Sequence, residues 1–536
     1  MKITLLAIHS EETYPGMPPW RFSLAFAYLQ AYLTTSPQYH RLTINRLTHG
    51  ESDAPVDIAR AVAATAPDLL AISCYLWNIR LVLELLPLAR AQQPSMRVVL
   101  GGPEINLESA RILENHPDVS YLAVGEGEVT FRELVEHLLD HPGDDPSRIR
   151  GLIHRDGANR PVINQPRETL QDLNVIPSPF ALGIVDLSRL EGGLVALESQ
   201  RGCILECAFC NYPKGFGKVR FFDLDRVLRD LEIILPHRPR QLYLMDPTFN
   251  SNRQRAKAIL EHLIRLKKQH RHDKLFLNAE MIPDLLTEDM ILLARDAGMS
   301  FIESGIQSFH PPTIAAMGRY RNDAKLLHNI DLALGHGVNL VPQLIIGLPG
   351  DSIAICFANF DRLYPLPTSD LHIFRLSLLP GTRYRREADR HGIRHIGVPP
   401  YHILESNDFS REDIQRLEGF RWLVKLTIPF KSTIAGLCQA AELPCHVPFD
   451  ACLAALPPAA ADSSHSIRSA AYRQGAMVLI DAFRDHLLGP IIDRLPAAER
   501  PFWTNQIKRG AKRAQWQLAT FLMNQARPVP SPSSEA

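Results

Sequence analysis

Short apolar runs alternate with segments of helical period through the first 140 or so residues. The apolar runs are bounded by turn or polar residues, as β-strands are. Strands that alternate with helices predict a doubly wound parallel sheet with helices on both faces, whose ligands bind at the carboxyl ends of the strands. The expected strands are residues 2–8, 41–47, 68–73, 97–100 and 119–124.

The same alternation restarts at about residue 192, after a connector that contains a predicted hairpin turn at Asp156-Gly157. Six strand–helix units in about 190 residues predict a partial parallel (β/α)6 barrel of TIM-like construction, with its site at the carboxyl ends of the strands. The expected strands of this second domain are residues 193–199, 241–246, 274–280, 300–305, 340–347 and 371–377.

The pattern becomes mainly helical after about residue 400, with apolar residues at helical spacing in 412–426, 472–488 and 501–525. The basic and aromatic residues of 502–517 are typical of an amphipathic helix with a solvated basic face, and nucleic acid is not an expected partner. The predicted domains are 1–140, a linker with a hairpin at 141–190, the barrel at 191–400, a helical extension at 401–525 and a disordered tail at 526–536.

Composition and charge narrow the possible functions. The chain has 58 basic and 58 acidic residues, so no overall field attracts it to nucleic acid or anionic lipid. No apolar run approaches the roughly 18 residues of a membrane span, and the start of the chain resembles a first strand rather than a signal peptide. The eight cysteines do not follow the regular spacing of a disulfide-bonded protein, which predicts free thiols and a cytoplasmic location.

Three of the cysteines, Cys203, Cys207 and Cys210, lie within eight residues. Zinc usually takes four ligands, commonly as two knuckles, and this group has no knuckle partner. A redox Cys-x-x-Cys motif would leave Cys203 unexplained. An iron–sulfur cluster held by three thiolates would leave one iron open for another ligand, and this interpretation explains both the number and the spacing. Cys438, Cys445 and Cys452 are expected to be buried thiols rather than a second metal site.

The segment "CILECAFC" resembles the Cys-x-x-x-Cys-x-aromatic-Cys signature of the radical S-adenosylmethionine superfamily, with Phe209 as the aromatic residue. The resemblance implies that the three cysteines hold a 4Fe-4S cluster whose open iron chelates S-adenosylmethionine. It further implies that reduction of the cluster releases a 5′-deoxyadenosyl radical, which abstracts hydrogen from a substrate. By the same resemblance, the S-adenosylmethionine site includes Phe209, Asp246, Glu280, Glu303, Gln307 and Arg319. A capping role for Asp246 and a surface position for Arg319 are the open alternatives.

The segments "CYLWN", "GGPE" and "GEGE" resemble the cobalamin-binding domain, of Rossmann or flavodoxin-like fold, that precedes many radical S-adenosylmethionine enzymes. Its implied cobalamin site is Ser73, Tyr75, Trp77, Asn78, Gly101, Gly102, Glu104, Gly125, Glu126 and Gly127. No Asp-x-His-x-x-Gly motif supplies a histidine to cobalt. A purely structural domain of this fold is the alternative, because glycine turns alone are weak evidence.

Together the two resemblances imply a cobalamin-dependent radical enzyme, foremost a C-methyltransferase acting on an unactivated carbon of a small-molecule or natural-product substrate. The first alternative is a rearrangement or cyclisation without net methylation. An alternative of another class is a non-catalytic cobalamin or redox sensor. The expected partners are the small-molecule substrate and an electron donor such as flavodoxin or ferredoxin. Nothing in the sequence identifies the substrate.

Overall fold

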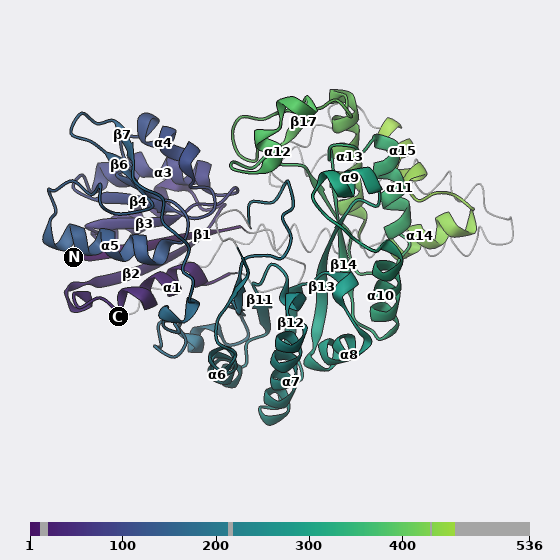
Figure 1. Cartoon of the computed structure of the whole chain (residues 1–536), viewed down its shortest axis with the longest axis horizontal. Helices are drawn as coiled ribbons and strands as arrows, with labels where there is room; N and C mark the ends of the chain where they lie inside the picture. Colours follow the sequence, from purple (N-terminus) through teal and green to yellow (C-terminus); the bar gives the residue numbers. More distant parts are fainter. Residues whose placement is uncertain (11–19, 213–217, 429–430, 456–536) are drawn as a thin grey trace. The chain divides into compact units, whose positions relative to one another are not determined.

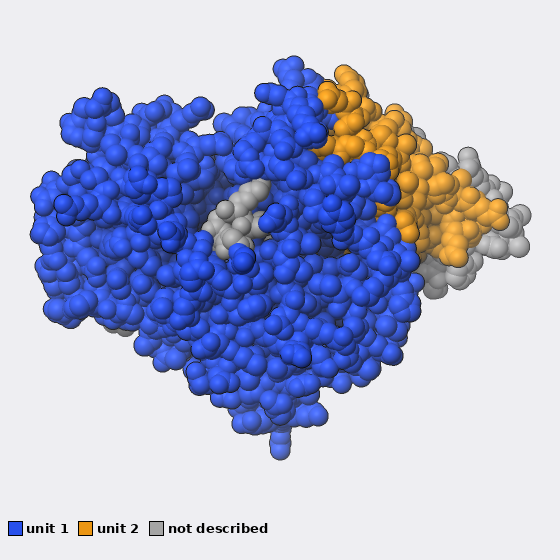
Figure 2. Space-filling view, viewed as in Figure 1, with its two compact units in different colours: residues 1–305, 311–340, 376–406 blue, residues 306–310, 341–375, 407–536 orange. Residues whose placement is uncertain are grey.

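The computed structural model describes residues 1–10, 20–212, 218–428 and 431–455. The chain divides into two compact units, which Figure 2 distinguishes by colour. Unit 1 comprises residues 1–305, 311–340 and 376–406, and unit 2 comprises residues 306–310, 341–375 and 407–536. The predicted helices at 472–488 and 501–525 and the predicted tail at 526–536 lie outside the described residues.

The first sheet has seven strands in the order β2-β1-β3-β4-β5-β6-β7 (Figure 1). The first five are parallel, and their order is that of the flavodoxin-like doubly wound sheet. The last two form the predicted hairpin and extend the sheet in antiparallel fashion. The strands are β1 (Lys2–His9), β2 (Thr43–Gly50), β3 (Leu69–Ser73), β4 (Arg97–Gly101), β5 (Tyr121–Ala123), β6 (Leu152–Arg155) and β7 (Pro161–Ile163).

Helices cover both faces of this sheet, and each face has its own apolar core. Residues of α2, α3 and α4 pack on one face, and residues of α1 and α5 pack on the other. The central strand β3 is buried at all five positions, as expected for a strand covered on both faces. The helices are α1 (Leu24–Leu33), α2 (Pro55–Ala64), α3 (Ile79–Gln92), α4 (Ala110–Asn115) and α5 (Gly127–Asp140).

The second sheet has six strands that follow one another in chain order, as a partial barrel of β/α units requires. The pairs β8–β11, β11–β12 and β12–β13 in unit 1 are parallel, and so is the pair β14–β15 in unit 2. These strands are β8 (Leu194–Leu197), β11 (Gln241–Leu244), β12 (Phe276–Glu280), β13 (Met299–Gln307), β14 (Leu340–Ile346) and β15 (His372–Arg375). Every strand predicted from the sequence is therefore present.

Helices alternate with these strands, as the sequence pattern predicts (Figure 1). The helices of this region are α6 (Leu224–Ile234), α7 (Arg253–Gln269), α8 (Glu288–Ala297), α9 (Pro311–Ala316), α10 (Asp323–Gly335) and α11 (Ile353–Leu363). Shorter elements of unit 1 are β9 (Gln200–Arg201), β10 (Arg220–Phe221), α12 (Arg383–Arg386), β16 (Arg394–His395) and β17 (Ile403–Glu405).

The described residues of unit 2 after 407 are mainly helical, and aromatic rings pack in their core. The rings of Phe360, Phe420 and Phe449 lie 4.9–5.7 Å apart between centroids. The predicted helix at 412–426 is α13 (Arg411–Thr427), and α14 (Lys431–Ala440) and α15 (His446–Ala455) follow it. Cys438, Cys445 and Cys452 are buried, as predicted, and none of them forms a disulfide.

Among the described residues, no helix combines the length and the apolar character needed to cross a membrane.

Candidate functional site

The three clustered cysteines lie on a loop that two very short strands close at its base. Strands β9 and β10 pair antiparallel, with Arg201 opposite Arg220. Gly202 is the first residue of the loop after β9. Its φ is +87°, a backbone conformation that residues with a side chain rarely adopt. A Cβ atom there would lie 2.9 Å from the carbonyl oxygen of Lys218. The sequence therefore needs glycine between the closing strand and Cys203.

Hydrogen-bond donors surround the three sulfur atoms. The Nε of Arg319 lies 3.0 Å from the Sγ of Cys207. The backbone N–H groups two residues beyond Cys203 and Cys210 donate to those sulfurs at 3.4 Å. Donors of this kind stabilise thiolates, the form in which cysteine binds metal. The structure thus brings the predicted Arg319 to the cysteine loop, although the two are distant in the sequence.

Backbone contacts also fasten the loop to the segment before Arg319. The N–H of Ala208 donates to the carbonyl of Met317 at 2.9 Å, and the carbonyl of Ala208 accepts from Tyr384 at 3.0 Å. The guanidinium of Arg319 lies 5.9 Å from the ring centroid of Phe209. The "MGR" segment is therefore part of the wall of the cysteine loop rather than a surface turn.

Asp246 follows β11, and its carboxylate holds the chain just before the cysteine loop. One oxygen accepts from the backbone N–H groups of Ser199 and Gln200 at 2.7 and 3.0 Å, and the other accepts from the Ser199 hydroxyl at 2.6 Å. Burial raises the pKa of Asp246 to about 6. A contact between Asp246 and S-adenosylmethionine stays a prediction, since these hydrogen bonds give the carboxylate a structural role of its own.

Glu280 ends β12 and stands opposite Glu303, a residue within β13, in the ladder of these two strands. Burial, together with the nearby charge of Glu303, raises the pKa of Glu280 to about 8. Gln307 belongs to unit 2, where its φ is +69° and its side chain is buried. The side-chain amide oxygen of Gln307 has no hydrogen-bond partner among the described residues. The roles of these three residues toward S-adenosylmethionine stay predictions.

At the carboxyl end of β3, two aromatic rings stack and a buried amide braces the turn. The rings of Tyr75 and Trp77 lie 4.5 Å apart between centroids, and Trp77 is 47% exposed. Asn78 is fully buried and donates to the carbonyls of Ile8 and Ser73, both at 3.0 Å. Trp77 therefore has surface available for a ligand, whereas the amide of Asn78 is engaged within the domain.

The predicted glycines differ in what surrounds them. Gly102 has φ of +98°, and a Cβ atom there would lie 2.6 Å from the carbonyl oxygen of Cys74. A Cβ at Gly127 would press on the side chain of Leu29 at 3.2 Å, and one at Gly101 would make ordinary contacts. Gly125 has φ of +85° and nothing within 4 Å of a Cβ position. Among the described residues, nothing therefore lies against the Cβ position of Gly125.

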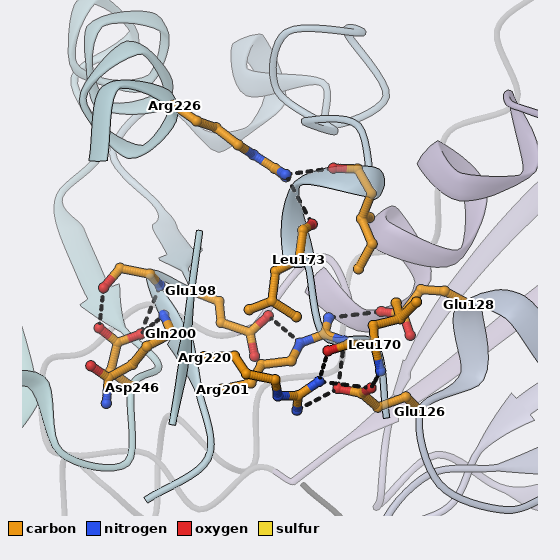
Figure 3. Close-up of polar contacts among 12 residues, drawn as sticks. Glu126, Glu128, Leu170, Leu173, Glu198, Gln200, Arg201, Arg220, Arg226 and Asp246 are labelled. Atoms are coloured by element: carbon orange, nitrogen blue, oxygen red, sulfur yellow. Dashed lines mark hydrogen bonds and ion pairs between the residues drawn. The ribbon is translucent and has the colours of Figure 1, made fainter. Parts of the chain in front are cut away.

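The two carboxylates predicted to contact cobalamin, Glu104 and Glu126, have protein partners in the structure, and their contact with cobalamin stays a prediction. The hydroxyl of Tyr401 donates to Glu104, whose pKa burial raises. Glu126 accepts hydrogen bonds from Arg201 and Arg220 (Figure 3). Sequence reasoning missed these partners, because nothing in the pattern connects positions so far apart in the chain. Only the place of Arg201, directly before Gly202 and the cysteines, marked it as part of the site.

The described residues contain no group of three or more His, Cys, Asp or Glu side chains placed to hold a single metal ion. This applies both to the cysteine loop and to the cysteines of α14 and α15. The residues present at the loop nevertheless fit an iron–sulfur cluster, since they supply three thiols with charged and backbone donors around them.

Comparison with protein families finds two matching domains. Residues 24–135 match the B12 binding domain, and residues 197–355 match the radical SAM superfamily. The chain therefore carries a B12 binding domain followed by a radical SAM domain. Both matches fall on the elements described above, the first on the doubly wound sheet and the second on the barrel from β8 to α11.

Two curated relatives agree with this assignment. The chain is 36% identical over 197 residues to the 2-(S-pantetheinyl)-carbapenam-3-carboxylate methyltransferase of Streptantibioticus cattleyicolor. It is 35% identical over 191 residues to the cobalamin-dependent radical SAM methyltransferase TokK of Streptomyces tokunonensis. These matches cover 35% and 34% of this chain, and each covers 28% of the relative.

A solved structure has a similar fold. The cobalamin-dependent S-adenosylmethionine radical enzyme OxsB, solved with aqua-cobalamin and S-adenosylmethionine, matches with a TM-score of 0.63 at 15% identity. The match covers 99% of this chain and 82% of OxsB. The fold predicted from the sequence, a doubly wound domain before a partial barrel, is thus confirmed.

Proposed function

We propose that this protein is a cobalamin-dependent radical S-adenosylmethionine enzyme, and specifically a C-methyltransferase acting on an unactivated carbon of a small-molecule or natural-product substrate. One observation carries the proposal: a loop with three thiols, lined by the guanidinium of Arg319, lies in the same chain as a B12 binding domain. The names of the two curated relatives, both methyltransferases, support the reaction type.

Cys203, Cys207 and Cys210 would hold a 4Fe-4S cluster as thiolates. When bound, the cluster, S-adenosylmethionine and cobalamin supply radical formation and methyl transfer. Arg319 places positive charge 3.0 Å from the Cys207 sulfur and so lowers the cost of burying negative thiolates. Asp246 fixes the chain that enters the loop, through its bonds to Ser199 and Gln200.

The carboxyl group at the end of β12 would be protonated at neutral pH. The pKa of Glu280 is raised to about 8, so this residue carries a proton and can donate a hydrogen bond. Glu303 lies beside it in register. We infer that the S-adenosylmethionine site comprises Phe209, Asp246, Glu280, Glu303, Gln307 and Arg319.

For cobalamin, the observations favour Gly125, with its open surroundings, and the exposed ring of Trp77 stacked on Tyr75. Ser73, Gly101 and Gly102 would complete the edge. Glu104 and Glu126 stay predicted members of this edge, with carboxylates that also bind Tyr401, Arg201 and Arg220. An aromatic surface next to a glycine turn suits a large flat ligand.

None of the eight cysteines forms a disulfide in the structure, which supports a reducing compartment such as the cytoplasm. We infer that a small redox protein, a flavodoxin or a ferredoxin, reduces the cluster there. The substrate would be a small molecule, since both curated relatives are named as methyltransferases and one name contains a carbapenam substrate.

The first experiment uses anaerobically purified full-length protein with its cluster reconstituted and hydroxocobalamin added. After desalting, we expect about four irons and one cobalt per chain, and 5′-deoxyadenosine when S-adenosylmethionine and a strong reductant are supplied. Cys207→Ala should abolish iron retention and deoxyadenosine formation. Cys356→Ala, at a buried thiol of α11 outside the loop, is the matched control and should change neither.

Two results would redirect the assignment. Deoxyadenosine formed with a true substrate but without a mass gain of one methylene unit in the product would favour rearrangement or cyclisation. Cluster and cobalamin bound without any cleavage of S-adenosylmethionine, with substrate present, would favour a sensor.

A further inference from the structure

The base of the cysteine loop is closed by two arginines. Arg201 in β9 and Arg220 in β10 stand directly opposite each other in a ladder only two residues long. Opposite residues of an antiparallel pair have Cβ atoms about 4.5–5.5 Å apart, and like charges at such positions destabilise the pairing. Both guanidinium groups are buried, with 9% and 7% of their side chains exposed, so water screens this repulsion little.

The carboxylates that neutralise these arginines come from the B12 binding domain (Figure 3). Glu126, the residue before α5, lies 2.9 Å from Arg220 and 3.3 Å from Arg201. Glu128, in the first turn of α5, lies 2.7 Å from Arg201. Both carboxylates are almost fully buried. One further carboxylate, Glu198 of the barrel itself, lies 3.0 Å from the Nε of Arg201.

Two more contacts join the same cluster to its surroundings. The guanidinium of Arg201 lies 5.5 Å from the ring centroid of Tyr28 in α1, a second contact with the B12 binding domain. Leu170, in the linker, donates its N–H to Glu126 at 2.8 Å and accepts from Arg220 through its carbonyl (Figure 3). Three segments, the B12 binding domain, the linker and the barrel, therefore meet at the base of the cysteine loop.

The B12 binding domain supplies three of the ion pairs that the closing arginines make. Without Glu126 and Glu128, the two buried guanidinium groups would lose three ion pairs of 2.7–3.3 Å. Burial also raises the pKa of Glu198, which pairs with Arg201, to about 7. A buried charge without a partner is strongly unfavourable. The two-residue ladder has few backbone hydrogen bonds with which to resist that repulsion. The loop would therefore open at its base.

We propose that Glu126 and Glu128 are positioning residues for the cysteine loop: they hold its base closed through Arg201 and Arg220. The B12 binding domain thus helps to build the site that holds the cluster, in addition to any cofactor of its own. This inference rests on the proposed function only in taking the loop as the cluster's binding site. It also connects the Gly125–Gly127 turn, beside the expected cobalamin, to the cysteines.

The direct test measures backbone hydrogen exchange in the full-length protein before any cofactor is added. In the double variant Glu126→Gln with Glu128→Gln, we expect the amides of 199–202 and 219–222 to exchange at least about tenfold faster than in the wild type. Exchange in β12 and β13 should stay unchanged. Glu133→Gln is the matched control, because Glu133 also lies in α5 and pairs with an arginine, Arg167, away from the loop.

A second readout follows the loop after reconstitution. The double variant should retain less iron, and its reduced cluster should give an altered electron paramagnetic resonance spectrum in the presence of S-adenosylmethionine. Glu133→Gln should match the wild type in both. Should the double variant fail to fold by circular dichroism, the single variant Glu128→Gln, which removes one ion pair, carries the same comparison.

Unchanged exchange at the base of the loop, in a folded variant, would overturn the inference. So would faster exchange spread evenly over the barrel, which would mean a general loss of stability. Neither result depends on methyl transfer. If the wild type binds no cluster, the proposed function fails while the exchange data still decide whether Glu126 and Glu128 close the loop.

Discussion

Two clusters of arginine, lysine and carboxylate in unit 1 use the same chemistry in different surroundings. In the junction cluster, Glu126, Glu128, Arg201 and Arg220 have side chains that are 5–9% exposed. In the surface cluster between α7 and α8, Arg253, Lys257 and Asp289 are 32–53% exposed. The shortest contact is 2.7 Å in both. The contact distances alone therefore do not show which cluster contributes more to stability.

The difference lies in burial and in what each cluster connects. An exposed ion pair gains about 0–1 kcal/mol, because water and salt screen it. Breaking a buried pair costs about 3–5 kcal/mol, because the remaining charge has neither water nor a partner. The surface cluster joins two consecutive barrel helices, whereas the junction cluster joins separate domains at a loop with three thiols. Because the junction cluster is buried beside the cysteine loop, its ion pairs contribute more to the structure of the site than exposed pairs would.

The largest expected effect comes from the backbone beside Arg201. Gly202→Ala places a Cβ atom 2.9 Å from the Lys218 carbonyl at a φ of +87°. Charge pairs cannot close the loop if the backbone cannot turn there, so we expect iron retention after reconstitution to fall nearly to zero. The control is Gly157→Ala, at a hairpin turn where nothing lies within 4 Å of a Cβ. Normal iron content in the Gly202 variant would show that charge rather than backbone geometry sets the closure.

The next prediction compares the loss in free energy of unfolding when one carboxylate of each cluster is neutralised. Glu126→Gln leaves two buried guanidinium groups short of charge and should lower the free energy of unfolding by about 3–5 kcal/mol. Asp289→Asn, which faces two cations in the exposed cluster, should lower it by no more than about 1 kcal/mol. Urea denaturation of the full-length protein measures both. Equal losses for the two variants would contradict the distinction drawn here.

The clusters should also respond to pH with opposite signs. Burial raises the pKa of Glu198 from 4.5 to about 7, so the folded state holds a proton that the unfolded state releases. The free energy of unfolding should therefore fall as pH rises through this window, by a slope of up to about one proton. The bond from Lys257 lowers the pKa of Asp289 below 3.8, so its contribution is present above that pH and is lost in acid.

Glu198→Gln cannot titrate and should flatten the dependence of unfolding free energy on pH between about pH 5 and 7. Asp289→Asn should leave that range unchanged and alter only the acid side. Denaturant unfolding at a series of pH values measures both slopes. An unchanged slope in the Glu198 variant would mean that Glu198 is ionised in the folded protein and that three carboxylates face the two arginines.

The sequence predicted the elements of this fold well, for a physical reason. Parallel strands buried on both faces leave continuous apolar runs, and helices between them leave a different period, so all the strands of the two parallel sheets could be located. The cysteine loop could be predicted equally well, because its three cysteines lie within eight residues of the sequence. Arg319 was identified only through a family resemblance, and the structure brings it within 3.0 Å of Cys207.

Contacts between domains could not be predicted in the same way. Glu104 and Glu126 end motifs at the ligand edge of the first sheet, which favours a cofactor contact, yet both have partners in later parts of the chain. A carboxylate beside a glycine turn has the same local sequence whether it faces a ligand or an arginine. The partner of Glu104, Tyr401, is 297 residues away, and no periodicity or spacing points to it.

The smallest expected effect tests screening. In a double-mutant cycle with Lys257→Met and Asp289→Asn, we expect a coupling of no more than about 1 kcal/mol at low salt, and almost none at 1 M salt, where the screening length is about 3 Å. A cycle with Arg220→Met and Glu126→Gln should give a larger coupling that changes little with salt, because solvent ions do not reach 5–7% exposed side chains. If salt weakened both cycles equally, the junction cluster would have to be open to solvent. It could not then hold the base of the cysteine loop by buried charge, and the loop would have to be closed by its backbone contacts alone.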